Sequence, residues 1–258
     1  MAEYADPQFS IDLSERTALV TGTTSGLGKR FAVLLAKCGA KVALTGRRTE
    51  RLEELAKEIE SFGGTCAPIA LDMTDTDSIL NVVAETEKQL GTPDILINNA
   101  GIPDAQRAHK MSIDLIDQVI DTNLRGPYVL SCEVARRLID KKMPGRMVNI
   151  SSVAAYRYDG NGAALYSTTK AAIARMTLAL AVEWSRYHIN VNGIAPGAFS
   201  SEMMDGMVGR MGDISQHFPR GRICQPEQMD STMLYLVSPS SECVTGTVIM
   251  VDDGQGGR

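Results

Sequence analysis

Apolar segments of strand length alternate with segments of helical periodicity along almost the whole chain. The runs TALVT at 17–21 and KVALT at 41–45 are short and uninterrupted, which is typical of strands buried on both faces of a parallel sheet. Between them Phe31, Leu34 and Leu35 recur at helical spacing, and similar helical patterns separate the later strands. Further strands are expected at 66–71, 94–101, 145–152, 189–197 and 246–254.

Repeated β–α alternation of this kind predicts an α/β fold of the Rossmann type, a doubly wound parallel sheet with helices on both faces. The 258 residues fit one large domain of this class, and we find no linker, low-complexity stretch or internal repeat that divides them. We therefore expect an N-terminal extension over residues 1–13 and a single dinucleotide-binding catalytic domain over residues 14–258.

Composition narrows the possible partners. A formal net charge of −5 argues against nucleic acid or an anionic membrane surface. No run approaches the ~18 apolar residues of a membrane span, and the polar start MAEYADPQFSIDLSER lacks the apolar region of a signal peptide. The five cysteines are scattered, with no Cys-x-x-Cys pair, so neither a disulfide framework nor a metal site is predicted. We expect a cytoplasmic protein.

A glycine-rich turn follows the first expected strand. Gly22, Gly26 and Gly28 have the spacing G-x-x-x-G-x-G, and Thr24 and Ser25 add hydroxyl donors between them. Glycine lets the backbone approach a ligand closely, while a helix N-terminus offers N–H groups and a positive dipole end to a pyrophosphate. The order strand, turn, helix therefore predicts dinucleotide binding.

The end of the second expected strand bears on which dinucleotide is bound. An acidic residue there would bind the ribose 2′-hydroxyl of NAD, but Gly46 holds that position and Arg47 and Arg48 follow it. Two guanidinium groups suit a 2′-phosphate. The alternative is a solvated pair at a helix start, where the helix dipole disfavours cations. NADP is therefore favoured over NAD.

Tyr166 stands four residues before Lys170 at the start of an expected helix. Positions i and i+4 share one helix face, with Cβ atoms about 5–6 Å apart. A lysine ammonium there would stabilise the phenolate and lower the pKa of the tyrosine from its ordinary value near ~10. Pairs of this spacing also arise by chance on solvated surfaces, so the surrounding motifs have to decide between the two interpretations.

Taken together, these stretches resemble the short-chain dehydrogenase/reductase superfamily, in the branch that includes 3-oxoacyl-carrier-protein reductases and many ketone reductases. The resemblance runs from about Thr17 to the C-terminus. Its motifs are T-G-x-x-x-G-x-G at 21–28, LD at 71–72, NNAG at 98–101, TNLRGP at 122–127, NISS at 149–152, YSTTK at 166–170, NVNGIAPG at 190–197 and VTGTVIMVDDG at 244–254.

The resemblance implies a catalytic tetrad of Asn123, Ser152, Tyr166 and Lys170. Tyr166 would be the general acid–base, and Lys170 would lower its pKa and bind the nicotinamide ribose. Ser152 would donate a hydrogen bond to the substrate oxygen, and Asn123 would hold a water that connects Lys170 to solvent. The expected cofactor contacts are Gly22, Thr24, Ser25, Gly26, Leu27, Gly28, Arg47, Arg48, Asp72, Met73, Asn99, Gly101, Tyr166, Lys170, Pro196, Gly197, Phe199 and Ser201.

The resemblance also assigns a mobile lid to about residues 198–222. Met203, Met204, Met207 and Met211 follow helical spacing there, which is usual for a core stripe but also suits irregular apolar ligands. Tyr156 and Tyr158 could line the same pocket, so a hydrophobic carbonyl or alcohol substrate is expected. The long helical stretches around 112–140 and 163–186 resemble those that build homotetramers in the family.

The resulting hypothesis is an NADP(H)-dependent oxidoreductase that interconverts a ketone and a secondary alcohol by hydride transfer. Two alternatives remain open, a 3-oxoacyl-carrier-protein reductase and an NAD-linked secondary alcohol dehydrogenase. A carrier-protein substrate would need a basic docking patch. The residues that supply positive charge for it are Arg136, Arg137, Lys141, Lys142 and Arg146.

Overall fold

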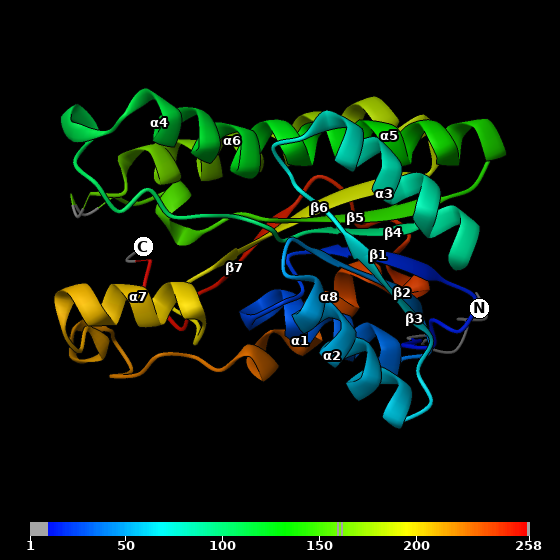
Figure 1. Cartoon of the computed structure of the whole chain (residues 1–258), viewed down its shortest axis with the longest axis horizontal. Coiled ribbons are helices and arrows are strands. Elements are labelled where there is room, and N and C mark those ends of the chain that lie inside the picture. The colour runs from blue at the N-terminus through cyan, green and yellow to red at the C-terminus, as the bar shows by residue number, and fades with distance from the viewer. Residues whose placement is uncertain (1–9, 159, 161, 257–258) are drawn as a thin grey trace, which may run out of the picture.

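A single seven-stranded sheet organises the chain (Figure 1). The computed structural model describes residues 10–158, 160 and 162–256. All strand pairs are parallel, in the order β3-β2-β1-β4-β5-β6-β7. The strands are β1 (Thr17–Thr21), β2 (Lys41–Gly46), β3 (Cys66–Ala70), β4 (Ile95–Asn98), β5 (Gly145–Ile150), β6 (Ile189–Pro196) and β7 (Val248–Val251).

Helices cover both faces of this sheet (Figure 1). Helices α1 (Gly26–Lys37), α2 (Thr49–Ser61) and α8 (Asp230–Val237) lie on one face. Helices α3 (Thr76–Gln89), α5 (Gly126–Lys141) and α6 (Ala164–Trp184) lie on the other, where α4 (Ile113–Ile120) continues through a π-helical segment at Asp121–Arg125 into α5. The expected doubly wound α/β fold is therefore confirmed.

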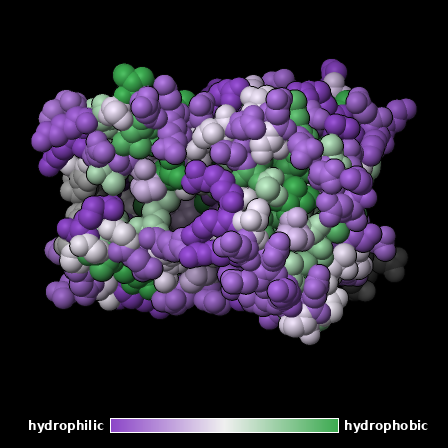
Figure 2. All heavy atoms as spheres, viewed as in Figure 1, coloured by the Kyte–Doolittle hydropathy of each residue, from purple (hydrophilic) through white to green (hydrophobic). Residues whose placement is uncertain are grey.

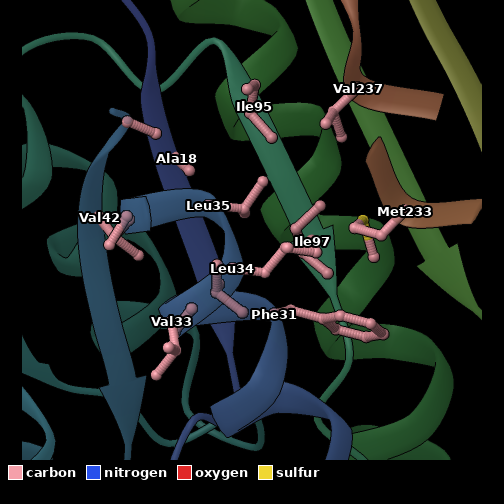
Figure 3. Close-up of a cluster of buried hydrophobic side chains, with 14 of the residues drawn as sticks. Ala18, Phe31, Val33, Leu34, Leu35, Val42, Ile95, Ile97, Met233 and Val237 are labelled. Atoms are coloured by element: carbon pink, nitrogen blue, oxygen red, sulfur yellow. The ribbon is translucent and has the colours of Figure 1, made fainter. Parts of the chain in front are cut away.

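Each face has its own hydrophobic core. Figure 3 shows Phe31, Leu34 and Leu35 of α1 pointing toward the strands, where Ile95 and Ile97 of β4 meet them. The central strand β1 is buried along its whole length, because helices cover both of its faces. Burial of this kind, at about 25 cal/mol per Å² of apolar surface, is the main force that holds the helices on the sheet.

The outer surface is mixed in character. Figure 2 shows a mostly hydrophilic face with scattered hydrophobic patches and a hollow between the α7 side and the helices above it. Helix α7 (Glu202–Met211) belongs to the expected lid. Among the described helices, none has the length and apolar character needed to cross a membrane.

Sequence patterns located the strands well but missed two features. Helix α8 was not anticipated, although Met229, Met233 and Leu236 are fully buried against α1 and the sheet. The expected extension also ends earlier than its composition indicated. Residues 1–9 lie outside the described part of the chain, but Leu13 is buried and its amide donates to the Cys38 carbonyl at 2.8 Å. A single apolar residue between polar ones gives no periodic signal.

Candidate active site

The glycine-rich turn connects β1 to α1 at the carboxyl edge of the sheet. Gly22 and Gly26 have φ angles of +71° and +53°, a backbone conformation that side chains with a Cβ rarely adopt. A Cβ on Gly28 would overlap the Gly22 carbonyl oxygen. Ser25, the residue before the helix, makes no side-chain cap, so the first N–H groups of α1 are free to bind a pyrophosphate.

Two neighbouring residues hold this turn in place. The Thr21 hydroxyl accepts from the Asn99 and Ala100 amides, both at 2.9 Å. The Asn99 side chain in turn donates to the Thr21 carbonyl at 2.9 Å and to the Gly22 carbonyl at 3.3 Å. Asn99 was expected to lie against the adenosine ribose. In this structure the side-chain amide of Asn99 instead holds the backbone of the glycine-rich turn through these two hydrogen bonds.

Arg47 and Arg48 point in different directions. The Arg48 guanidinium donates to the Thr24 hydroxyl at 2.6 Å and pairs with Glu202 at 2.9 Å. Arg47 instead lines a cavity of about 560 Å³ together with Asp72, and its charge helps to lower the pKa of that carboxyl group, after the hydrogen bonds from Thr74. The two arginines therefore flank the end of β2 from both sides.

The same cavity extends from the sheet edge to α4. Asp72 is held by Thr74, whose amide and hydroxyl donate to it at 2.9 and 2.8 Å. The opposite wall belongs to α4 and its flanks. Met73 and Leu27 were also expected at the cofactor, but the Met73 side chain is buried in one core and Leu27 packs against the other. The full set of lining residues is Arg47, Asp72, Thr74, Ser112, Asp114, Leu115, Gln118 and Asp121.

Ser152, Tyr166 and Lys170 meet at the carboxyl end of β5. The Ser152 hydroxyl is hydrogen-bonded to the Tyr166 phenol, and Lys170 Nζ lies 5.6 Å from the centre of the tyrosine ring. The Lys170 ammonium donates to the Ile150 carbonyl at 2.7 Å. Helix α6 supplies two of these groups because positions 166 and 170 share one helical face.

The electrostatics of this cluster differ from the expectation. Burial raises the pKa of Tyr166, and this exceeds the lowering caused by the Ser152 hydrogen bond, while the negative charge of Asp104 raises it further. The expected lowering of the Tyr166 pKa by Lys170 is therefore not found in this structure. Burial also lowers the pKa of Lys170 to about 8, because a low-dielectric surrounding disfavours the charged ammonium.

Asn123 enters the site from the π-helical segment between α4 and α5. Its side-chain oxygen accepts from the Ile102 amide at 2.8 Å, and its nitrogen donates to the Ile102 carbonyl at 2.9 Å. A π-bulge of this kind is frequent at functional sites. Gly101 lies next to Asn123 and Lys170. A Cβ added to Gly101 would stand 3.4 Å from Asn123 Oδ1 and 3.5 Å from Lys170 Nζ. All four expected tetrad residues are thus brought together.

The lid begins directly over the glycine-rich turn. A Cβ on Gly26 would stand 3.0 Å from Ser201 Cβ, and Ser201 caps α7 by accepting from the Met204 amide at 3.2 Å. Before it, Pro196 ends β6, the Gly197 amide donates to the Val251 carbonyl at 3.0 Å, and the Phe199 side chain is buried. The start of the lid therefore lies between the end of β6 and the glycine-rich turn.

The methionines of α7 do not form a core stripe. Met203 is exposed, and Met204 and Met207 are half-buried; the side chain of Met211 lies outside the described residues. Tyr156 and Tyr158 are also about half exposed. Within the described part of the chain, no group of three or more His, Cys, Asp or Glu side chains is arranged to hold a metal ion.

Sequence reasoning missed two acidic residues of the site. Glu202 accepts from Arg48 and from Arg51, which ties α7 to α2 across the entrance of the glycine-rich turn. Asp104 is buried and accepts from the backbone at the start of α6. Neither residue belongs to a local motif, because the arginine partners of Glu202 and the α6 amides bound by Asp104 lie more than 60 residues away in the chain.

Comparisons with known proteins identify the family of this chain. Residues 16–210 match the family model of short chain dehydrogenases. The chain is 36% identical over 245 residues to gluconate 5-dehydrogenase of Gluconobacter oxydans, covering 94% of this chain and 95% of that protein. It is 35% identical over 243 residues to 3-oxoacyl-acyl-carrier-protein reductase FabG of Thermotoga maritima, covering 94% and 98% of the two chains.

A solved structure gives the same picture in three dimensions. A variant of actinorhodin polyketide ketoreductase, solved with NADPH, superposes with a TM-score of 0.90 at 29% identity, covering 97% of this chain and 100% of that one. The protein belongs to the short-chain dehydrogenase/reductase family. It is an oxidoreductase that acts on CH–OH groups with NAD(P).

Proposed function

We propose that this enzyme interconverts a ketone and a secondary alcohol with NADP(H), using Tyr166 as the general acid–base. The observation that carries the proposal is the meeting of Ser152, Tyr166 and Lys170 at the end of β5, beside the glycine-rich turn. Such a cluster provides a proton donor, an oxygen-binding hydroxyl and a cation within one buried site.

The residues divide the chemistry as follows. When bound, the nicotinamide would supply the hydride in reduction and accept it in oxidation. Tyr166 donates its proton to the substrate oxygen in reduction and removes it in oxidation, and Ser152 holds that oxygen by a hydrogen bond that strengthens as negative charge develops. Lys170 would bind the nicotinamide ribose. Asn123 Oδ1 keeps a second lone pair after accepting from Ile102, so it can hold a water that returns protons to Lys170.

Reduction and oxidation need opposite protonation states of Tyr166 at the start of the reaction. A phenol that stays protonated at neutral pH is ready to donate, whereas alcohol oxidation needs the phenolate. Replacing Tyr166 by Phe removes the proton donor and preserves the ring. We expect kcat to fall by about 10²–10⁴ with NADPH affinity little changed; a variant that kept its full kcat would contradict the proposed role.

The preference for NADP over NAD is supported by Arg48. Its guanidinium lies against the Thr24 hydroxyl and within 3.4 Å of the Ser25 hydroxyl, at the end of β2 where the ribose of a dinucleotide binds in Rossmann folds. Fluorescence titration with NADPH and NADH should show tighter NADPH binding, and Arg48→Ala should remove most of the difference. Equal binding of the two cofactors by the parent enzyme would favour the NAD-linked alcohol dehydrogenase instead.

The substrate is proposed to be a hydrophobic or mid-sized carbonyl compound, held between Tyr156, Tyr158 and the α7 methionines. The carrier-protein alternative receives less support, because the basic residues of α5 are paired. Arg136 and Arg137 both contact Glu133, and Lys141 contacts Glu87 at 2.8 Å. Glu133 and Glu87 therefore offset part of the positive charge that would attract an acidic partner.

Two probes separate the substrate classes that the relatives' names offer. NADPH consumption would be followed with 5-ketogluconate, a polyhydroxy acid, and with an acetoacetyl thioester. Turnover of the thioester with a low KM would favour 3-oxoacyl reduction, and turnover of the keto acid would favour a sugar-acid dehydrogenase. Substituting Met204 and Met207 by Ala should raise KM for bulky apolar ketones and leave these polar probes unaffected.

A homotetramer is proposed from the outer face of α5 and α6. Tyr128, Leu178 and Val182 are exposed there, Val182 by 78%, and a cavity of about 190 Å³ lies between the same helices. Exposed apolar residues gathered on two adjacent helices are characteristic of protein interfaces. Light scattering should give the mass of four chains, and Val182→Glu should reduce it while the far-ultraviolet spectrum stays unchanged.

A further inference from the structure

Helix α6 begins without a cap of its own. The residue before the helix is Ala163, which has no side-chain acceptor and makes no cap hydrogen bond. The amides of the second and third helical residues, Leu165 and Tyr166, would therefore lack partners inside the helix. At an exposed helix start, water accepts hydrogen bonds from such amides. The start of α6 instead lies at the buried site and carries the proposed proton donor.

Asp104 supplies the missing acceptor from a distant part of the chain. Its Oδ2 accepts from the Leu165 amide at 2.9 Å and the Tyr166 amide at 3.1 Å, across 61 and 62 residues of sequence. Its Oδ1 accepts from the Ala105 amide at 2.8 Å. Asp104 is only 3% exposed, and all of these bonds come from N–H donors, as suits an ionised carboxylate at the positive end of a helix.

The segment that carries Asp104 also holds the other side of the site. Ile102, two residues earlier, makes both backbone hydrogen bonds to the Asn123 side chain. Ala105, the next residue, has φ +46°, a conformation that costs a non-glycine residue roughly 1–2 kcal/mol. Such a strained backbone persists only where the surrounding contacts hold it in place. Here those contacts fix the position of the Asp104 carboxylate.

We propose that Asp104 is a positioning residue, which caps α6 from across the site, fixes the Tyr166 backbone and brings a negative charge to the start of the helix that carries the phenol. The inference rests on the proposed function of Tyr166 as the proton donor. It assigns two separable tasks to one carboxylate. The hydrogen bonds orient the helix, and the charge acts on the phenol itself.

The charge of Asp104 acts on the phenol, Lys170 Nζ lies 5.6 Å from the ring centre, and the Ser152 hydroxyl is hydrogen-bonded to the phenol oxygen. The other charged groups on elements packed against α6 remain unchanged in every variant below. They are Asp114 and Asp117 on α4, Asp121 and Arg125 in the π-helical segment, Arg146 on β5 and Arg186 after α6.

Asp104→Asn separates the two tasks, because asparagine is as good a cap acceptor as aspartate but carries no charge. Tyr166 would be titrated by ultraviolet absorbance of tyrosinate, as the difference between each protein and the same protein with Tyr166→Phe. The asparagine oxygen can keep the two bonds from the α6 amides, while its NH2 group replaces the oxygen that accepts from Ala105. We therefore expect the Tyr166 titration of the Asp104→Asn enzyme to move to lower pH, with a melting temperature below that of the parent but above that of Asp104→Ala. A titration that coincides with the parent's, or moves upward, would overturn the proposal.

Asp104→Ala removes both tasks. We expect a lower melting temperature and a kcat reduced by about tenfold or more, since misplacing a reacting group by 1 Å costs as much as 10²-fold, with Asp104→Asn restoring most of the loss. Unchanged kcat in Asp104→Ala would overturn the positioning role. If Asp104→Ala does not fold, Asp104→Asn still decides, because the titration needs neither substrate nor turnover. Full activity of Tyr166→Phe alone would refute the proposed function instead.

Discussion

The floor of the site and its lid are built by different kinds of interaction. The floor, at the ends of β1, β4 and β5, is buried and fixed by backbone contacts, as at Gly28 and at Lys170. The lid contains α7 and projects from the body in Figure 1, and none of the side chains described in that helix, at 202–210, is fully buried. It is held by exposed ion pairs at Glu202 and Asp253.

The difference indicates that the floor contributes folding stability and that the lid contributes ligand specificity. Close packing makes the floor intolerant of small changes in volume, whereas exposed ion pairs contribute little to folding. Segments with few buried contacts open at low free-energy cost. We therefore expect the lid to change its conformation on ligand binding without disturbing the proposed catalytic groups.

The largest expected contrast comes from the same substitution in the two regions. Gly28→Ala would force a Cβ into the Gly22 carbonyl, so we expect a loss of about 1–3 kcal/mol in unfolding free energy and no detectable NADPH binding. Gly209→Ala is the matched control inside α7, where a Cβ would meet nothing within 4 Å. There alanine should stabilise the helix by about 0.5–1 kcal/mol. Equal effects on melting and NADPH titration would refute the contrast.

The next effect concerns the pH dependence of the floor. The pKa of Lys170 is about 8 in the folded chain against an ordinary 10.5. Between these values the unfolded chain binds a proton that the folded chain has released, so stability rises with pH. Urea unfolding should show the parent gaining about 2 kcal/mol relative to Lys170→Met between pH 8 and pH 10. Above that range the raised pKa of Tyr166 acts in the opposite direction.

A smaller effect is expected where the lid meets the proposed 2′-phosphate position. Glu202 occupies Arg48 and Arg51, so a phosphate has to compete with its carboxylate. Glu202→Gln should tighten NADPH binding about two- to fivefold, the equivalent of one exposed ion pair, and leave NADH binding unchanged. Asp205→Asn, on the same helix, is the control for the loss of one acidic residue. Parallel gains for both cofactors would show that Glu202 does not face the phosphate.

The smallest effect on stability is expected at the other attachment of the lid. Asp253 has φ +54° and pairs with Arg220 at 3.0 Å and Arg222 at 2.7 Å. Asp253→Gly would relieve the left-handed conformation while releasing both arginines. We expect little change in melting temperature but faster proteolytic cleavage within 200–224, and a higher KM for the carbonyl substrate. Unchanged cleavage would mean that the ion pairs do not restrain the lid.

The sequence by itself determined the sheet, the glycine-rich turn and the placing of Tyr166 and Lys170 on one helix face. These features depend on local physics: apolar strand runs, glycine where the backbone must turn, and the i, i+4 relation of Tyr166 and Lys170. Each is written within a few neighbouring residues, so a reader of the sequence can find it. The family assignment followed from the order of these local motifs and is confirmed.

Only the tertiary structure decided the electrostatics of the site. The sequence pattern predicted a lowered pKa for Tyr166, but burial and Asp104 raise it. The sequence also contained no signal for the different directions of Arg47 and Arg48. The same is true of the Glu202 ion pairs and of the Asp104 cap on α6. These features depend on contacts between residues far apart in the chain. The electrostatic energy of such contacts is set by solvent exposure and by the distance between charges, rather than by residue type or spacing.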